Sequence, residues 1–140
     1  MSQIEHILKK SKIANTRNYT MPYKLAPDIP DNLLESFMTD SEIAVDTELH
    51  GLRLFRDEVC LVQICDDKNN VCLIKPEINQ SPPNLKLLLT HPDVTKVFHF
   101  AISDVAFIKT SLNIEVGPFC CTKVMSKLIR TYTQDHGLKD

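Results

Sequence analysis

Two carboxylates stand at the end of an apolar segment, Ile43–Val45, where Asp46 and Glu48 are separated only by Thr47. In an extended chain successive side chains alternate between faces, so residues two apart project from the same face. A pair of carboxylates at this spacing offers hard oxygen ligands to Mg²⁺ or Mn²⁺. The same pattern on an exposed sheet edge is equally compatible with two solvated acids, so its meaning depends on a third acidic residue in a matching place.

Asp104 is that third acidic residue, because it follows a predicted strand that ends at His99. It falls in the first turn of a predicted helix over 101–112, where polar groups gather at the carboxyl ends of parallel strands. The alternative interpretation is that the helix macrodipole favours an acid there. The residues around Asp104 are mostly apolar, however, and converging carboxylates repel unless a divalent cation lies between them. The three acids together indicate metal-ion chemistry.

The elements that must position these acids follow from the apolar pattern. It predicts helices over 32–38, from 84 to about 90, over 101–112 and over 122–131, with Asp31 capping the first; it predicts strands over 42–48, 59–65, 71–75, 95–99 and near 119–121. Short links favour antiparallel pairing of the first three strands, and intervening helices favour parallel pairing of the later ones. We therefore predict an α/β fold: a mixed sheet with helices on both faces.

Length and composition fit one domain. The chain has 140 residues, 43% of them hydrophobic, and a formal charge of −2, which excludes a polycation that binds nucleic acid through bulk charge. No apolar stretch is long enough for a membrane span, and the first residues lack the pattern of a secretory signal, so we expect a cytoplasmic protein. Residues 1–22 are predicted to be a loosely held extension, and residues 23–140 the domain.

Five cysteines are present, without the Cys-x-x-Cys spacing of a zinc site. We expect them to be small buried residues with free thiols in a reducing compartment. The chain has only three glycines, which argues against a glycine-rich phosphate loop.

The ordered motifs resemble a known family. The segment 43–48, followed by 61–64, resembles the first exonuclease motif of the ribonuclease D group in the DEDD superfamily of 3′-to-5′ exonucleases. The segment 97–101 with Asp104 resembles the second motif. Residues 121–123, 130–133 and 136–140 are similar to the stretch that follows in small bacterial ribonuclease D-like proteins. The resemblance runs from about Lys24 to the last residue and implies a ribonuclease H-like fold.

By this resemblance Asp46, Glu48 and Asp104 are the catalytic residues and the ligands of two divalent ions, Mg²⁺ or Mn²⁺. The implied reaction is hydrolysis of the phosphodiester bond at a single-stranded 3′ end, with RNA as the expected substrate. The product is a nucleoside 5′-monophosphate.

One motif of the family is missing from these residues. Its third motif, a Tyr followed four residues later by an Asp, normally lies several tens of residues beyond the last position here, and Tyr132 is followed at that distance by His136. We therefore expect a fold that is incomplete at the C-terminus and a truncated product or fragment of a longer gene, with apolar surface left exposed. The alternative function is a catalytically inactive remnant that binds nucleic acid or a protein partner.

Several neighbours of the acids are candidates for substrate binding. The backbone N–H of Thr47 could reach the terminal ribose, and Leu49 and Phe100 could pack against terminal bases. Burial in the core is the favoured alternative for Leu49 and Phe100, although the resemblance favours Leu49 as a wedge between bases. His99 could touch a phosphate, but a structural hydrogen bond is the favoured role.

Basic residues follow the predicted last helix at Lys123, Lys127 and Arg130. Their spacing of four and then three residues places them on one stripe that could follow a phosphate backbone. A solvated helix face explains the same pattern.

Overall fold

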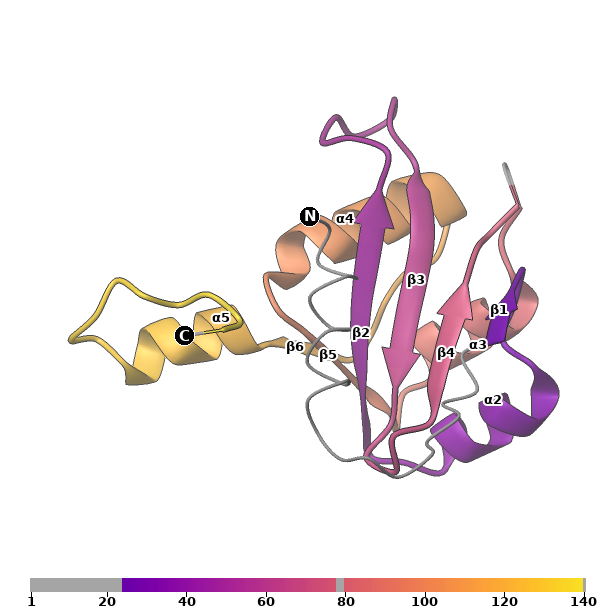
Figure 1. Ribbon diagram of the computed structural model, residues 1–140, viewed down its shortest axis with the longest axis horizontal. Helices are drawn as coiled ribbons and strands as arrows, with labels where there is room; N and C mark the ends of the chain where they lie inside the picture. Colours follow the sequence, from indigo (N-terminus) through magenta and orange to yellow (C-terminus); the bar gives the residue numbers. More distant parts are fainter. Residues whose placement is uncertain (1–23, 78–79, 140) are drawn as a thin grey trace, which may run out of the picture.

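The computed structural model describes residues 24–77 and 80–139, so the predicted extension over 1–22 lies outside the described residues. A six-stranded mixed sheet with the order β1-β4-β3-β2-β5-β6 forms its centre (Figure 1). Along the chain the elements are β1 (Lys24–Ala26), α2 (Asp31–Met38), β2 (Glu42–Leu49), β3 (Val59–Cys65), β4 (Val71–Ile74), α3 (Pro83–Thr90), β5 (Thr95–Phe98), α4 (Ala101–Leu112), β6 (Phe119–Cys121) and α5 (Thr122–Ile129).

The pairing of the strands confirms the predicted mixed sheet. Strands β2 and β3, and β3 and β4, pair antiparallel. Strands β2 and β5, and β5 and β6, pair parallel, with α4 crossing between β5 and β6. The prediction missed β1, which pairs parallel with β4. Three residues followed by Pro27 are too few to show a strand's alternating pattern.

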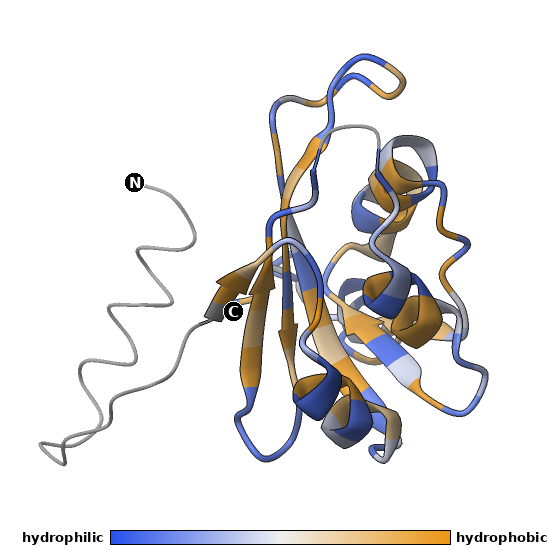
Figure 2. Cartoon of the chain, turned by 90° about the vertical axis from the view of Figure 1, so that its right-hand side faces the viewer, coloured by the Kyte–Doolittle hydropathy of each residue, from blue (hydrophilic) through white to orange (hydrophobic). Residues whose placement is uncertain are grey.

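Helices cover only one face of the sheet in the described part of the chain, and the prediction of helices on both faces was wrong. In Figure 2 the sheet lies on one side and the helices on the other. Residues of β2 that point toward the helices, Ile43 and Val45, are buried, whereas Ala44 on the opposite face is exposed. In a sheet with one solvated face, buried and exposed residues alternate along each strand in this way. The face of β2 that no helix of the described residues covers carries Asp46.

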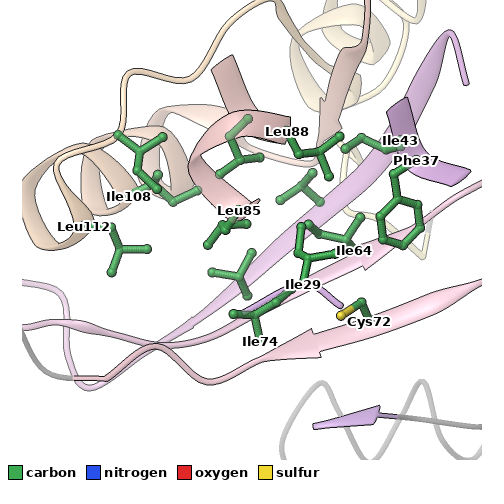
Figure 3. Packing of buried hydrophobic residues seen from close by; sticks show 14 of the residues in the cluster. Ile29, Phe37, Ile43, Ile64, Cys72, Ile74, Leu85, Leu88, Ile108 and Leu112 are labelled. Carbon is green, nitrogen blue, oxygen red and sulfur yellow. The ribbon is translucent and has the colours of Figure 1, made fainter. Parts of the chain in front are cut away.

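The hydrophobic core lies between the sheet and α2, α3 and α4 (Figure 3). Its members include residues from every layer: Ile29, Phe37, Ile43, Ile64, Cys72, Ile74, Leu85, Leu88, Ile108 and Leu112. Helix α3 contributes three buried leucines. Fully burying an aliphatic side chain is worth about 1.5–3 kcal/mol, so this layer fixes the strand ends that carry the acids.

Two helix starts differ from expectation. Asp31 is the first residue of α2 and not its cap; Pro30 takes the N-cap position. Asp28 instead accepts hydrogen bonds from the backbone N–H groups of Asn84 and Leu85, at 2.9 Å each, at the start of α3. These amides have no partner within their own helix, so Asp28 takes the part of a cap from 56 residues away in the sequence.

Helix α5 differs from the other helices because none of its residues is buried. It extends beyond β6, away from the sheet (Figure 1). Its exposed apolar side chains are Val124, Met125, Leu128 and Ile129. Helix α5 ends at Ile129, two residues earlier than predicted.

All five cysteines are free thiols, as expected, but only Cys72 is buried. The other four are half-buried, because they point toward the uncovered face or lie near the sheet edge. No helix of the described residues is long and apolar enough to cross a membrane.

Candidate active site

Asp46 and Glu48 lie near the carboxyl end of β2 and share the strand face that no helix of the described residues covers. Asp46 pairs across the sheet with Gln63, whose Nε2 donates to its Oδ2 at 3.5 Å. Between Glu48 and Leu49 the register with β3 shifts. Such irregularities bend a strand and re-aim its side chains, and they recur beside active sites.

A hydrogen bond connects β2 to α4 at this point. Thr47 points to the core side, and its Oγ1 donates to Oδ1 of Asp104 at 2.6 Å. Asp104 is 7% exposed and lies in the first turn of α4. The strand and the helix therefore bring the third predicted acid to the same end of β2 as the first two. Sequence analysis missed the Thr47 hydroxyl; a threonine on the core face of a strand is a signal for such a bond.

The three carboxyl groups have pKa values above their ordinary range. Burial raises the pKa of Asp104, and the charge of Asp46 raises it further against the lowering effect of the Thr47 hydrogen bond. Burial raises the pKa of Asp46, while a backbone hydrogen bond of Thr47 and the charge of His99 lower it. Burial and the charge of Asp46 raise the pKa of Glu48. Asp46 thus couples electrostatically to both other acids.

His99 forms a hydrogen bond within the protein. It follows the last residue of β5, and its Nδ1 lies 2.9 Å from Oγ1 of Thr122 in α5. The same hydroxyl donates to the carbonyl of Phe98. This hydrogen bond ties the start of α5 to the end of β5, and the charge of His99 still reaches Asp46.

Leu49 and Phe100 have different surroundings. Leu49 is half-buried and packs against the hydrophobic core. Phe100 is 49% exposed, so the expectation that it is buried was wrong. Its backbone is left-handed, with φ of 72°, where the chain turns from β5 into α4. This turn directs the ring away from the core.

Of the three predicted basic residues, Lys123 contacts the residue that precedes α4. Its Nζ lies 4.4 Å from the centroid of the Phe100 ring. Lys127 is exposed in the last turn of α5, and Arg130 follows the helix as its C-cap. The predicted basic stripe therefore holds for Lys123 and Lys127, whereas Arg130 lies outside the helix.

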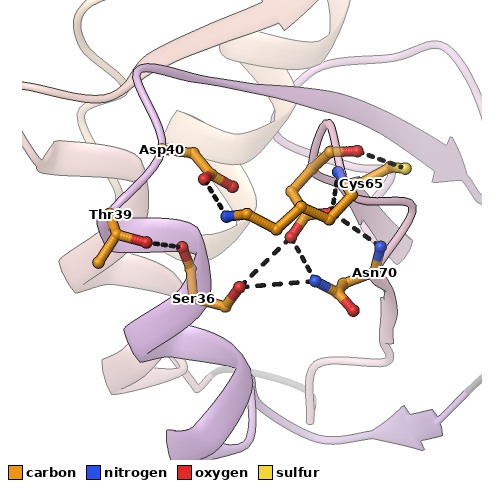
Figure 4. A network of polar contacts seen from close by, with 7 residues as sticks. Ser36, Thr39, Asp40, Cys65 and Asn70 are labelled. Carbon is orange, nitrogen blue, oxygen red and sulfur yellow. Dashed lines mark hydrogen bonds and ion pairs between the residues drawn. The ribbon is translucent and has the colours of Figure 1, made fainter.

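A second group of acids lies at the opposite end of β2. Asp40, Asp66 and Asp67 are the one group of three possible metal ligands in residues 24–77 and 80–139 whose ligand atoms all lie within 4.8 Å of one another. The acids of the predicted site are spaced more widely. Asp66 accepts from the backbone N–H groups of Lys68 and Asn70 and from the Asn70 side chain (Figure 4). Lys68 forms an ion pair with Asp40.

The carboxylate oxygens of Asp46, Glu48 and Asp104 are suitable ligands for a divalent cation. These three carboxylates accept from two side-chain donors, Thr47 and Gln63, and the Glu48 side chain forms no hydrogen bond or ion pair within the described residues. Carboxylates that are partly desolvated and short of donors are the hard oxygen ligands that Mg²⁺ and Mn²⁺ prefer. The arrangement can hold metal ions where a phosphate group has access from solvent.

Comparison with known proteins identifies the class. Residues 25–140 match the family model of the 3′-5′ exonuclease domain. The exosome complex exonuclease RRP6 of Saccharomyces cerevisiae is 30% identical over 71% of this chain and 14% of its own length. The ribonuclease D of Cronobacter turicensis is 27% identical over 69% of this chain and 26% of its own length.

A solved structure agrees with the sequence comparisons. NrnC of Brucella melitensis, bound to pGG, is 38% identical and superimposes with a TM-score of 0.75, covering 82% of this chain and 55% of that one. The chain belongs to the 3′-5′ exonuclease domain family and has the ribonuclease H-like fold of DEDD nucleases. It spans about a seventh to a quarter of the curated relatives named above and about half of the solved nuclease.

Proposed function

We propose that this protein is a metal-dependent 3′-to-5′ exonuclease that hydrolyses the phosphodiester bond at a single-stranded 3′ end, with RNA as the substrate. The observation that carries the proposal is the position of Asp46, Glu48 and Asp104 at the same end of β2, within a chain of the exonuclease family. The product is a nucleoside 5′-monophosphate.

Asp46, Glu48 and Asp104 would hold the divalent ions. Bound ions supply activation of the attacking water and neutralise charge on the phosphate and the leaving 3′ oxygen. A solved structure of Brucella melitensis NrnC contains Mg²⁺, and its sequence is 37% identical to this chain. Mg²⁺ or Mn²⁺ is accordingly the proposed cofactor.

The protein's own groups bind and orient. Thr47 Oγ1 holds the Asp104 carboxylate in one orientation, which matters because small errors in the placement of reacting groups reduce rates strongly. Leu49, at the register shift, is a wedge against the terminal base, and the backbone N–H of Thr47 is a donor to the terminal ribose. Lys127 and Arg130 extend the positive charge along the path of the nucleic acid, while His99 fixes the start of α5.

A second candidate function is binding of nucleic acid or of a protein partner without cleavage. It is supported by the exposed apolar side chains of α5, Val124, Met125, Leu128 and Ile129. The same carboxylates and basic residues would then serve binding alone. A cytoplasmic location also stays a prediction.

The two functions are separated by one experiment. The purified chain is incubated with a 5′-labelled single-stranded RNA and Mg²⁺ or Mn²⁺, beside an Asp46→Ala variant and an EDTA control. Stepwise shortening from the 3′ end by the unmodified chain alone supports the exonuclease. Equal, absent shortening in all three reactions, with retained binding of the RNA, supports the second function. A DNA strand of the same sequence tests the preference for RNA.

A further inference from the structure

Phe100 is in a position that a phenylalanine does not favour on two separate grounds. Its φ of 72° lies in the left-handed region, where a Cβ atom crowds the following carbonyl. It is also the N-cap of α4, a position that favours Ser, Thr, Asp or Asn, and it makes no side-chain capping hydrogen bond. Local costs of this kind persist at functional sites, where the surroundings hold the residue in place.

Burial in the core does not explain an aromatic side chain at position 100. Phe100 is 49% exposed, whereas Phe98 and Phe107 on either side of it in the sequence are buried in the core. The backbone turn therefore presents an aromatic ring to solvent one helical turn before Asp104. The exposed ring therefore belongs to the turn that begins the helix of Asp104.

A cation covers one side of the ring. The Nζ atom of Lys123 lies 4.4 Å from the ring centroid, within the range of a cation–π contact. The hydrogen bond between His99 and Thr122 connects the residues that directly precede Phe100 and Lys123. The contact places an ammonium group over one face of an aromatic ring, just beyond the carboxyl end of β5.

We propose that Phe100 and Lys123 form a nucleotide-docking element, in which a base near the 3′ end stacks on the Phe100 ring and Lys123 binds a neighbouring phosphate. Every base has a face that can stack, so the element accepts any sequence. It requires that the base is unpaired, and so it selects single-stranded ends. The inference rests on the proposed nucleic-acid substrate, but it concerns binding and does not require cleavage.

Binding is therefore measured without turnover, with Asp46→Asn as the background and a 5′-fluorescein single-stranded RNA followed by anisotropy. Phe100→Asn removes the ring, while asparagine tolerates the left-handed backbone. We expect the affinity to fall about 5- to 100-fold, as for loss of one stacked base, with an unchanged or raised melting temperature. Phe100→Tyr should retain the affinity.

Phe55 provides a matched control. It is 89% exposed and also left-handed, with φ of 67°, and it lies in the loop between β2 and β3. Phe55→Asn removes the same ring and the same strain, and we expect little change in affinity. Equal losses for the Phe55 and Phe100 variants would overturn the proposal, because loss of any surface aromatic would then explain both.

An abasic series identifies the stacked nucleotide. The base is removed at each of the last three positions in turn, and each removal should weaken the binding of RNA to the protein that keeps Phe100. At one of these positions, removal of the base should cause no further loss of affinity in the Phe100→Asn variant. Losses that add at every position would refute stacking on Phe100. Lys123→Met should lower the slope of log affinity against log salt by about one, and an unchanged slope would remove Lys123 from the element.

Failure of this element and failure of the nuclease are distinguishable. If the unmodified chain shortens RNA but Phe100→Asn does not change binding, only the docking element is wrong. If RNA binding depends on Phe100 in the abasic series but no shortening occurs with any metal, the docking element stands and the exonuclease proposal fails.

Discussion

The two ends of β2 both carry acidic groups, but the groups have different surroundings. At the end nearest Asn70, the carboxylate of Asp66 accepts hydrogen bonds from two backbone amides and two side chains. At the carboxyl end, Asp46, Glu48 and Asp104 form no ion pair within the described residues, and burial raises their pKa values, with a further rise from the charge of Asp46 for Glu48 and Asp104. Asp66 is satisfied by the protein itself, whereas the acids at the other end are short of positive partners.

This difference gives a way to separate structural acids from ligand-binding acids. Closeness alone selects the wrong group, because the tighter cluster is Asp40, Asp66 and Asp67. In that cluster Lys68 already supplies a cation, although Oδ2 of Asp40 is buried without a partner among the described residues. The lack of an ion-pair partner within the described residues is the more informative property, since a partly buried carboxylate without a cation beside it is costly unless function requires it.

The largest expected effect tests the end that is short of positive partners. Asp46→Asn should reduce the rate of mononucleotide release by at least about 100-fold, because even groups that only support a metal ligand contribute 10- to 100-fold. Rates are compared well below the melting temperature, with Asp67→Asn as the matched control at the other end. A control that loses as much activity would break the comparison.

The opposite end should respond in stability. Asp66→Ala removes the acceptor for the Lys68 and Asn70 amides and for the Asn70 side chain, so we expect the free energy of unfolding to fall by about 2–4 kcal/mol. Urea titration measures this change. If the variant is as stable as the unmodified chain but no longer binds Mn²⁺, then Asp66 is a metal ligand and the assignment of the two ends is reversed.

Lys96 extends the comparison to a buried cation. It is 0% exposed, and its Nζ donates to the carbonyl groups of His91, Val94 and Gly117. Lys96→Met should lower the free energy of unfolding by about 2–3 kcal/mol, because three carbonyls lose their donor.

The contribution of Lys96 to stability should also depend on pH. Burial lowers the pKa of Lys96 to about 8 from 10.5. Between these values the unfolded chain holds a proton that the folded chain has released, so this residue makes stability rise with pH in that window. The difference between unmodified chain and Lys96→Met, followed by urea titration from pH 7.5 to 10, should therefore grow. A constant difference would show that Lys96 stays charged when folded.

The smallest expected effect is a gain in stability at the candidate active site. Asp104→Asn removes a carboxylate whose charged form is disfavoured in the folded state, while its oxygen can still accept from Thr47. Thermal melting at pH 7 without metal should show an increase of a few degrees. Mn²⁺ should raise the melting temperature of the unmodified chain, EDTA should reverse this, and the variant should respond less. A lower melting temperature of the metal-free variant would mean that Asp104 is a structural acid.

Much of the fold followed from the sequence where the pattern was regular. Helix α4 and strand β3 have the predicted bounds, because apolar residues repeat clearly over each. Strand β1 was missed because three residues carry no period. The uncovered sheet face was missed because half-apolar residues such as Cys65 are compatible with either surroundings.

The candidate site was predictable in its acids but not in its neighbours. The spacing of Asp46 and Glu48 fixes a shared strand face, and Asp104 follows from its place after a strand. The exposure of Phe100 could not be predicted, because hydrophobicity favours burial and the left-handed backbone depends on how α4 packs. The hydrogen bonds that Asp66 accepts could not be predicted, because the polar segment that contains it indicated only a turn.

Asp28 has a practical consequence for anyone who shortens this chain. Because its carboxylate holds the first amides of α3, a version that starts at Asp31 would lose both β1 and these contacts. Such a version would be expected to express poorly for reasons unrelated to catalysis. Limited proteolysis before trimming would locate a safe starting point ahead of Lys24.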